Sequence, residues 1–388
     1  MKHISFLFVL LLCLPLGAQQ TYRARVVDAE TGESLSFVNI KTQTSGGLSN
    51  KHGYFTIKTN SSDEELFFSH VGYESLSIRA GTIPSVIKMV PAFRKMTELI
   101  VRPHNLSYIL RQIIKRLKKD YADSSDINRL FFMRSNLKTE TGNEMQECFL
   151  YAKSAVNLRN LAVVSGKNWL EVNQTNNESL LKSFNIQVLL QLGAYVRDVP
   201  FWDKALFPLH KIRRSKAAYE PTLSILNEGD SEIFKINMRH GFFTLKGNNS
   251  VRPDEMPSPV IIGDIYADKD YRLLKFDGEA HFVMLRHKEK TKRVTVNFQI
   301  VYRHDCNFTE VSHVYLDGGN ESFSFNAIIF NLGNEEEEIH PAIQINKDNL
   351  ISAIHSSVQD DRLWELYNII MRTEEEEEFA KRANMQLE

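Results

Sequence analysis

The sequence is poor in the features that would assign a chemistry directly. It has three Cys and three Trp in 388 residues, and its 47 Lys and Arg nearly balance 48 Asp and Glu. So few cysteines exclude a disulfide-dense scaffold, and without a CxxC motif or a Cys/His cluster a structural zinc site has no support. The formal charge of −1 argues against a nucleic-acid partner, because nucleic-acid-binding proteins normally carry a basic excess. The sequence also lacks P-loop, GxGxxG, GxSxG and HExxH motifs, so it marks no catalytic, cofactor-binding or metal-ligating residue and predicts no cofactor.

Long apolar runs are missing beyond the N-terminus. Met1-Lys2-His3 is a short basic start, residues 4–16 are mostly apolar, and the small residues Gly17 and Ala18 follow. This order is typical of a secretory signal peptide, and the apolar run is too short to span a bilayer comfortably. We therefore predict a signal peptide over residues 1–18, cleaved after Ala18, with a retained N-terminal anchor as the alternative. The mature protein is expected to be soluble outside the cytoplasm.

Residues 19–92 are rich in short β-prone segments separated by turn residues. Segments at this spacing, with little helical periodicity, are typical of a small β-sandwich. The expected strands are residues 22–27, 37–41, 54–58, 65–69, 73–79 and 85–89.

A specific set of residues lies within that region. It reads Val27-Asp28…Thr31-Gly32-Glu33-Ser34-Leu35…Val38-Asn39-Ile40…Gly47…Ser49-Asn50…Gly53-Tyr54-Phe55…Leu66…Ser69…Val71-Gly72-Tyr73. The pattern resembles the carboxypeptidase-regulatory-like domain of Bacteroidetes-type envelope proteins, which often precedes outer-membrane transporters. The resemblance implies a transthyretin-like sandwich and a periplasmic or outer-membrane-associated protein. It implies no peptidase, because none of the twelve His is followed by Glu at the third position, as a zinc-binding HxxE pair requires. There are two departures from the family: Ala24 replaces a usual Gly, and Ser49-Asn50 replaces Thr-Asp.

Residues 93–128 form a linker with the clearest helical period of the chain, over residues 105–121. Asn105 is a plausible N-cap, and Pro103 is interpreted as an upstream stop. One face is apolar, and the other is basic through Arg111, Lys115, Arg116, Lys118 and Lys119. This helix either packs on its neighbour with a solvated basic face, or binds an anionic membrane surface or an acidic partner.

Residues 129–388 are predicted to form a larger β-rich domain, which makes the fold class mainly β. Turns are expected at Asp268-Lys269-Asp270 and Asp277-Gly278, so the strands should form an antiparallel, meandering and curved sheet. The tail from Asp360 is predicted as a C-terminal helix that docks on the sheet, continued by Glu374 to Glu378. The residues around 234–237 and 263–274 resemble the curved sheet of uncharacterised proteins that follow the same sandwich. The expected strands are residues 130–137, 148–158, 231–238, 260–267, 272–276, 279–285, 293–302 and 311–316.

Three features of the second domain leave alternatives open. The Phe- and Trp-rich stretch 184–208 either plugs the sheet or forms a binding surface. Cys148 and Cys306 form one disulfide or remain two buried thiols. A calcium site within residues 374–378 is only weakly indicated, because consecutive helical carboxylates point in different directions.

The absence of catalytic motifs favours a non-catalytic envelope protein that binds an outer-membrane or periplasmic protein partner. One variant of this hypothesis has Trp169, Trp202 or Trp364 stack on a polysaccharide. The first alternative is a hydrolase of envelope polymers, with His281, His287 or His304 beside an acid in an open pocket. The second is a periplasmic carrier, with an apolar cavity inside the curved sheet. The sequence specifies neither the oligomeric state nor the ligand.

Overall fold

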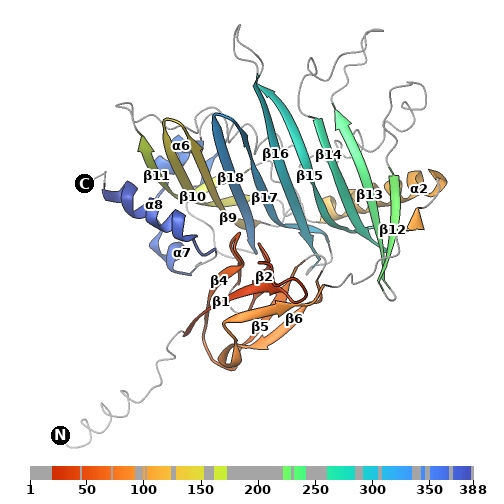
Figure 1. Ribbon diagram of the computed structural model, residues 1–388, viewed down its shortest axis with the longest axis horizontal. Helices are drawn as coiled ribbons and strands as arrows, with labels where there is room; N and C mark the ends of the chain where they lie inside the picture. The colour runs from red at the N-terminus through yellow and green to blue at the C-terminus, as the bar shows by residue number, and fades with distance from the viewer. Residues whose placement is uncertain are drawn as a thin grey trace, which may run out of the picture. The chain divides into compact units, whose positions relative to one another are not determined.

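The fold is that of a computed structural model of the chain (Figure 1). The chain divides into two compact units: Met1–Ala92 with Asp361–Glu375, and Phe93–Asp360 with Glu376–Glu388. Both units consist mainly of β-strands, as predicted. The structure describes residues 20–43, 46–70, 73–91, 99–100, 103–123, 128–152, 161–172, 222–228, 231–241, 260–284, 292–304, 308–333, 342–345, 350–366 and 370–385. The predicted signal peptide, the stretch 184–208 and Cys306 lie outside these residues, as do the four consecutive glutamates at 335–338.

The first unit is a small sandwich of two sheets. One sheet has the order β4-β1-β7 and the other β3-β2-β5-β6. Side chains alternate between the two faces of a strand, so every second residue points into the core between the sheets. The most buried of these, each at most 1% exposed, are Val26, Ile40, Phe55, Leu66 and Phe68. The strands are β1 (Gln20–Asp28), β2 (Asn39–Lys41), β3 (Gly46–Leu48), β4 (Tyr54–Thr59), β5 (Glu65–Ser69), β6 (Leu76–Arg79) and β7 (Val86–Met89), with a short 3-10 helix η1 (Ala80–Thr82) before β7.

The C-terminal tail returns to this sandwich. It contains two separate helices, α7 (Asp361–Leu366) and α8 (Glu374–Met385), so the prediction of one continuous helix was wrong. Ile370, between them, forms a parallel bridge with Leu48 of β3 and is 5% exposed. We predicted that the apolar part of the tail docks on the large sheet, but Ile370, at its end, pairs with a strand edge of the sandwich.

The second unit contains a twelve-stranded sheet in which every neighbouring pair is antiparallel. Two meanders of consecutive strands build it, and the pairing of β18 with β9 joins them. In the first meander and its edge lie β9 (Arg129–Thr139), β10 (Gly142–Ala152), β11 (Ala162–Val172) and β19 (Ile343–Gln344). The second contains β12 (Thr222–Glu228), β13 (Ser231–Gly241), β14 (Val260–Asp268), β15 (Leu273–Met284), β16 (Lys292–Arg303), β17 (Glu310–Asn320) and β18 (Phe323–Gly333), with β8 (Leu99–Ile100) at its outer edge.

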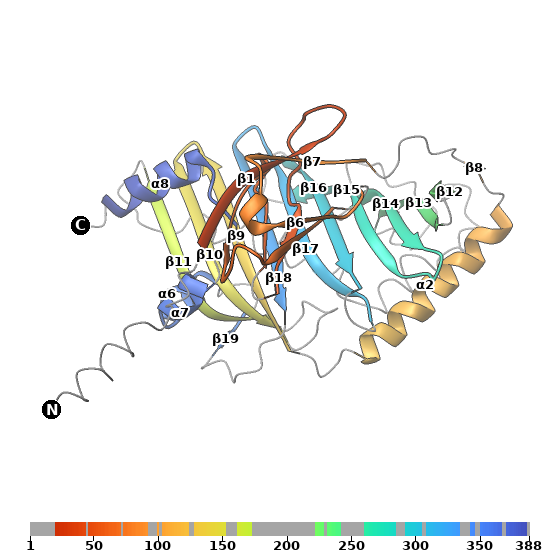
Figure 2. The same cartoon turned by 90° about the horizontal axis from the view of Figure 1, so that it is seen from below.

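Helices cover both faces of the large sheet, as Figure 2 shows. The apolar side chains of α2 (Pro103–Asp123) and α6 (Leu350–Ser356) join one large core with the inward side chains of the strands. On the opposite face, Phe379 of α8 packs with Met145 and Trp169. Within the described residues, no helix combines the length and apolarity needed to cross a bilayer.

Several local predictions for the second unit need correction. Asp277-Gly278 is not a turn but the middle of β15, because Gly278 pairs with Gly263 where the two strands approach closely. A Cβ on Gly278 would lie 2.1 Å from the carbonyl oxygen of Ile262, so only glycine fits there. Pro103 begins α2 rather than stopping the chain before it, as proline does at a first helical position. Strand β10 begins six residues earlier than predicted, and β11, β12 and β18 were not predicted.

Candidate functional site

The residues of the sandwich that resemble the family pattern stabilise its turns. The Asp28 carboxylate accepts hydrogen bonds from the backbone N–H groups of Glu30 (2.7 Å) and Thr31 (2.8 Å) and from the Tyr73 hydroxyl (2.7 Å). The Thr31 and Tyr73 bonds lower the pKa of Asp28, while burial and the Asp28 contact raise the pKa of Tyr73 to about 12. Gly32 has φ +74°, which few other residues adopt. The motif therefore holds the loop after β1 in place and presents no reactive group.

Ser49 and Asn50, which together depart from the family pattern, both stabilise one turn. Ser49 Oγ accepts from the Val38 N–H and donates to the Leu35 carbonyl, both at 2.9 Å. Asn50 Oδ1 accepts from the N–H groups of His52 and Tyr54, as an Asp oxygen would. Both side chains are buried, so they fix the turn before β4.

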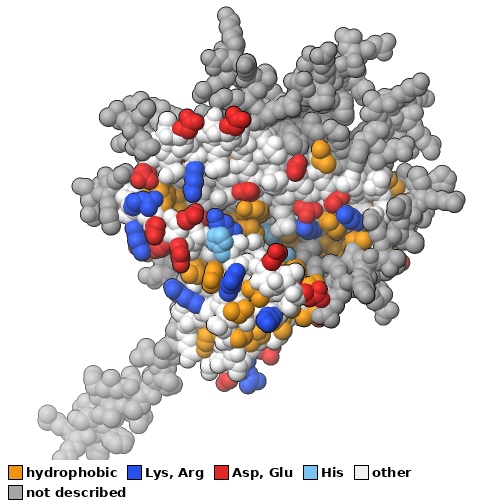
Figure 3. All heavy atoms as spheres, in the orientation of Figure 1, with side chains coloured by type: hydrophobic (Ala, Val, Ile, Leu, Met, Phe, Trp, Pro, Cys, Tyr) orange, Lys and Arg blue, Asp and Glu red, His pale blue; other side chains and the backbone are white. Residues whose placement is uncertain are grey.

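The outward face of the four-stranded sheet presents an aromatic side chain. Phe67 on β5 is 48% exposed, although its neighbours Leu66 and Phe68 are fully buried. The register places Lys41 of β2 on one side of Phe67 and Ser77 of β6 on the other. We call the outward residues Asn39, Lys41, Glu65, Phe67, Ser69, Ser77 and Arg79 the Phe67 face. In Figure 3, apolar side chains lie among charged ones over the sandwich strands.

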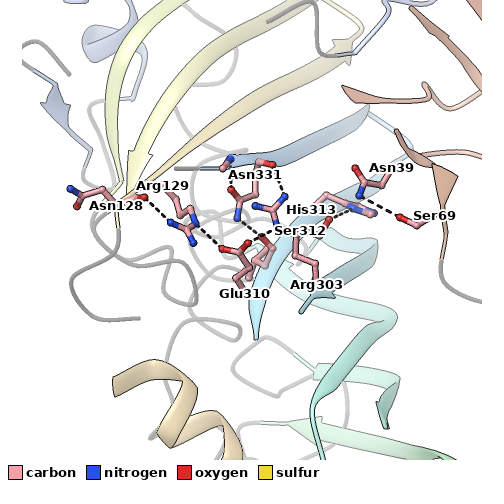
Figure 4. A network of polar contacts seen from close by, with 11 residues as sticks. Asn39, Ser69, Asn128, Arg129, Arg303, Glu310, Ser312, His313 and Asn331 are labelled. Carbon is pink, nitrogen blue, oxygen red and sulfur yellow. Dashed lines mark hydrogen bonds and ion pairs between the residues drawn. The ribbon is translucent and has the colours of Figure 1, made fainter. Parts of the chain in front are cut away.

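The ends of three strands in the large sheet share a buried ionic network (Figure 4). Glu310 of β17 accepts from Arg129 Nε through Oε2 (2.7 Å) and from Arg303 Nε through Oε1 (2.5 Å). Arg129 also donates to the Asn128 carbonyl, and Arg303 to the Asn331 carbonyl. Arg129 and Glu310 are 2% and 1% exposed. Both carboxylate oxygens of Glu310 are therefore engaged by guanidinium groups, which suits a structural clamp better than a general base.

A second network holds α8 on the sheet. Arg134 Nε donates to Glu147 Oε1 at 2.7 Å, and Arg134 Nη1 lies 3.5 Å from Glu376 Oε2. Asn136 donates to both Glu376 and Asn326. Glu376 thus contributes to helix docking, and among the described residues no three His, Cys, Asp or Glu side chains are placed to hold a metal ion.

Two lysine–aspartate ion pairs lie on the outward face of β13, β14 and β15, one across neighbouring strands and one along β15. Lys235 Nζ lies 3.3 Å from Asp264 Oδ2, and Lys275 Nζ lies 2.5 Å from Asp277 Oδ2. Both ammonium groups lie within 6 Å of the centroid of the Tyr266 ring. Each of these ion pairs, together with the ring of Tyr266, stabilises a half-buried sheet surface.

His304 is the one predicted histidine whose side chain the structure describes. Burial, followed by the charge of Arg272, lowers its pKa. Its Nδ1 lies 3.3 Å from Thr309 Oγ1, and its Nε2 is buried without a hydrogen bond among the described residues. The carboxylate of Asp120 acts on His304 electrostatically and is itself fully buried in an ion pair with Arg116. The histidine thus has acids nearby but is largely buried. The side chain of His281, and all of His287, lie outside the described residues.

Two further predicted residues prove to be core residues. Trp169 is 5% exposed between Met145 and Phe379, so its ring does not present a platform for a sugar. Cys148 is a buried free thiol whose pKa is raised by burial, so the disulfide alternative does not hold for it. Trp364 is half-buried, and Trp202 lies outside the described residues.

The Phe67 face and the buried network around Glu310 carry weak sequence signals and were not predicted. Sequence analysis did not single out Phe67, Arg129 or Glu310. Phe67 stands at an outward position of an alternating strand and could have been found from that alternation. The Arg129–Glu310 pair joins residues 181 positions apart and could not have been found from spacing.

Comparison with known proteins supports one part of the chain. A search of the curated proteins found no match. A crystal structure of a putative membrane-associated protein of unknown function from Bacteroides fragilis matches with 9% identity over 82% of this chain and 99% of that chain, but its TM-score of 0.16 is too low to carry an argument. Residues 23–99 match the family model of the CarboxypepD_reg-like domain, which covers the sandwich described above. The chain therefore contains a CarboxypepD_reg-like domain at residues 23–99.

Proposed function

We propose that this chain is a non-catalytic cell-envelope protein whose sandwich binds a protein partner in the periplasm or outer membrane. One observation carries the proposal: the CarboxypepD_reg-like domain presents Phe67 half-exposed in the middle of a polar outer face. Protein interfaces commonly place an aromatic anchor inside a polar rim. The signal-peptide pattern at the N-terminus supports an envelope location.

The exposed part of Phe67 is large enough to matter for binding. A buried phenylalanine covers roughly 200 Å², and Phe67 is 48% exposed. A partner would therefore remove roughly 100 Å² of apolar surface from water, which contributes about 2.5 kcal/mol at about 25 cal/mol per Å². That amount is typical of a residue that dominates a binding interface.

The ionic networks of the large sheet support a scaffold rather than a catalyst. The buried carboxylates of Glu310 and Glu147 are both held by arginine side chains. Each such pair fixes one strand relative to another. We therefore assign these charges to the architecture of the sheet and the binding role to the sandwich.

Site-specific photo-crosslinking in cells tests the proposal. A photoreactive residue at Lys41, beside Phe67, should capture a discrete envelope protein, identified by mass spectrometry. The same residue at Tyr54, which is 45% exposed on the other sheet, is the matched control. Phe67→Ala in the Lys41 variant should abolish capture without changing the amount of exported protein.

The outcomes separate the three functional hypotheses. Capture that is equal from positions 41 and 54, or unchanged by Phe67→Ala, would contradict a binding role for this face. Lipid recovered with the purified protein would favour the apolar carrier. Release of sugar or peptide fragments from isolated envelopes would favour the hydrolase.

A further inference from the structure

Among the described residues, the chain pairs with one edge of the four-stranded sheet and leaves the opposite edge without a partner strand. In the sheet β3-β2-β5-β6, the two edge strands are β3 and β6. Ile370 forms a parallel bridge with Leu48 on the β3 edge and is almost fully buried there. The described residues include no strand that pairs with β6 on its outer side. The chain thus already places one of its own residues, Ile370, in a β-bridge on one edge of this sheet.

The register of β6 shows which backbone groups its free edge presents. The Ala80 N–H donates to the Glu64 carbonyl at 2.8 Å, and Leu66 and Phe68 pair with Ile78 and Leu76. Because hydrogen-bonded and non-hydrogen-bonded pairs alternate in an antiparallel ladder, Ser77 and Arg79 point their N–H and C=O groups away from β5. The Arg79 carbonyl accepts from Thr82 Oγ1. Within the described part of the chain, the Arg79 N–H and both backbone groups of Ser77 therefore remain open to a further strand.

The side chains beside that edge define what a further strand would carry. Ser77 stands directly opposite Phe67, and Arg79 directly opposite Glu65. Because Ser77 is small, an apolar side chain placed over it would reach the exposed ring of Phe67. Arg79 is exposed and forms no ion pair within the described part of the chain, so an acidic side chain next to it would be favoured. Residues on one face of a strand are two positions apart.

We propose that β6 is the docking edge for an extended segment of a protein partner, which adds a fifth strand to the sheet. The segment carries an apolar side chain against Phe67 and an acidic side chain against Arg79, two residues apart. In such complexes main-chain hydrogen bonds provide affinity, and alternate side chains provide specificity. This inference rests on the proposed function and specifies the chemistry of the partner.

The test is selection of displayed seven-residue peptides on the purified full chain. Enriched peptides should pair an apolar and an acidic residue two positions apart. Arg79→Glu should switch the preference from acidic to basic peptides. Hydrogen exchange of the Ser77 and Arg79 amides should slow when a selected peptide binds.

A matched pair of proline variants tests the geometry. Ser77→Pro removes an outward N–H without disturbing the ladder to β5, and edge strands tolerate such a proline. Val86→Pro makes the same change on β7, the edge of the other sheet, where the register and the Arg25 N–H to Ser85 carbonyl bond point Val86 outward. Peptide binding should weaken at least tenfold in Ser77→Pro and stay unchanged in Val86→Pro. Phe67→Ala should weaken it as well, while Tyr54→Ala should not.

Three results would overturn the inference. The first is the absence of enriched peptides, and the second is binding that is unaffected by Ser77→Pro, Phe67→Ala and Arg79→Glu. The third is a concentration-dependent dimer that Ser77→Pro dissociates, which would make a second copy of the chain the occupant.

Capture from Lys41 in cells without peptide binding at β6 would leave the proposed function intact and refute only the strand addition. Peptide binding without capture in cells would refute the proposed function.

Discussion

Glu310→Gln should destabilise the large sheet far more than a surface substitution. Glu310 is 1% exposed, and its two oxygens engage Arg129 and Arg303 at 2.7 and 2.5 Å. Glutamine keeps the shape and one acceptor but leaves the Arg129 charge, 2% exposed, without its carboxylate. Breaking a buried ion pair in this way costs about 3–5 kcal/mol, and we expect about 3 kcal/mol because one acceptor remains. At a urea slope of about 3 kcal/mol per M, the unfolding midpoint should fall by about 1 M.

Urea unfolding followed by tryptophan fluorescence measures this shift, because Trp169 is buried in the same unit. Glu321→Gln is the control, since Glu321 is exposed and its change should stay within about 0.5 kcal/mol. The triple variant Arg129→Met/Arg303→Met/Glu310→Leu should recover most of the loss, because apolar residues of similar volume often replace a buried ionic triad without cost. Equal midpoints for Glu310→Gln and Glu321→Gln would refute the clamp. A triple variant less stable than Glu310→Gln would show that packing, not charge, dominates there.

Four other predictions follow from single residues. Phe379→Ala should cost about 3 kcal/mol and expose Trp169, seen as a red shift in fluorescence and as faster proteolysis of α8. Gly278→Ala should cost about 3 kcal/mol in urea unfolding, because its Cβ would collide with the backbone of β14. Burial raises the pKa of Cys148, so mass spectrometry should show iodoacetamide labelling only after unfolding. Burial lowers the pKa of His304, so the unfolded chain binds its proton more readily. The free energy of unfolding should therefore fall as pH drops below about 6.5, and the slope should diminish in His304→Gln.

The sandwich could be predicted in detail because its signals are local. Gly32 with positive φ, the turn-forming side chains of Asp28 and Asn50, and the alternation of β5 each act within a few residues. The predicted segment 65–69 coincides with β5, and the family match over residues 23–99 covers most of the sandwich. The mainly β fold, the large antiparallel sheet and the amphipathic helix α2 could be predicted for the same reason, since periodicity is a property of neighbours.

The large sheet was less predictable where distant segments meet. Asp277-Gly278 has the composition of a turn, yet Gly278 lies in a strand because Gly263, fifteen residues earlier, comes close to it. The joining of β9 to β18 brings together residues 190 positions apart, such as Asn136 and Asn326. No local sequence pattern encodes such pairs, so the ion pairs and hydrogen bonds that join these strands were not predicted.

The free edge of β6 shows how function depends on the least predictable kind of contact. Sequence alternation places Phe67 on an outer face, but only the pairing of β5 with β6 brings Ser77 beside it. Likewise, the apolar residues of the tail are consistent with a helix, and only the structure places Ile370 on the β3 edge. An edge strand offers the same backbone groups to any extended chain, so the side chains next to it must provide the selectivity. On β6 these are an aromatic ring and a guanidinium group, which is why the Arg79→Glu charge reversal is the most discriminating single substitution. If peptide preference does not follow that charge, backbone pairing alone cannot give this domain a specific partner.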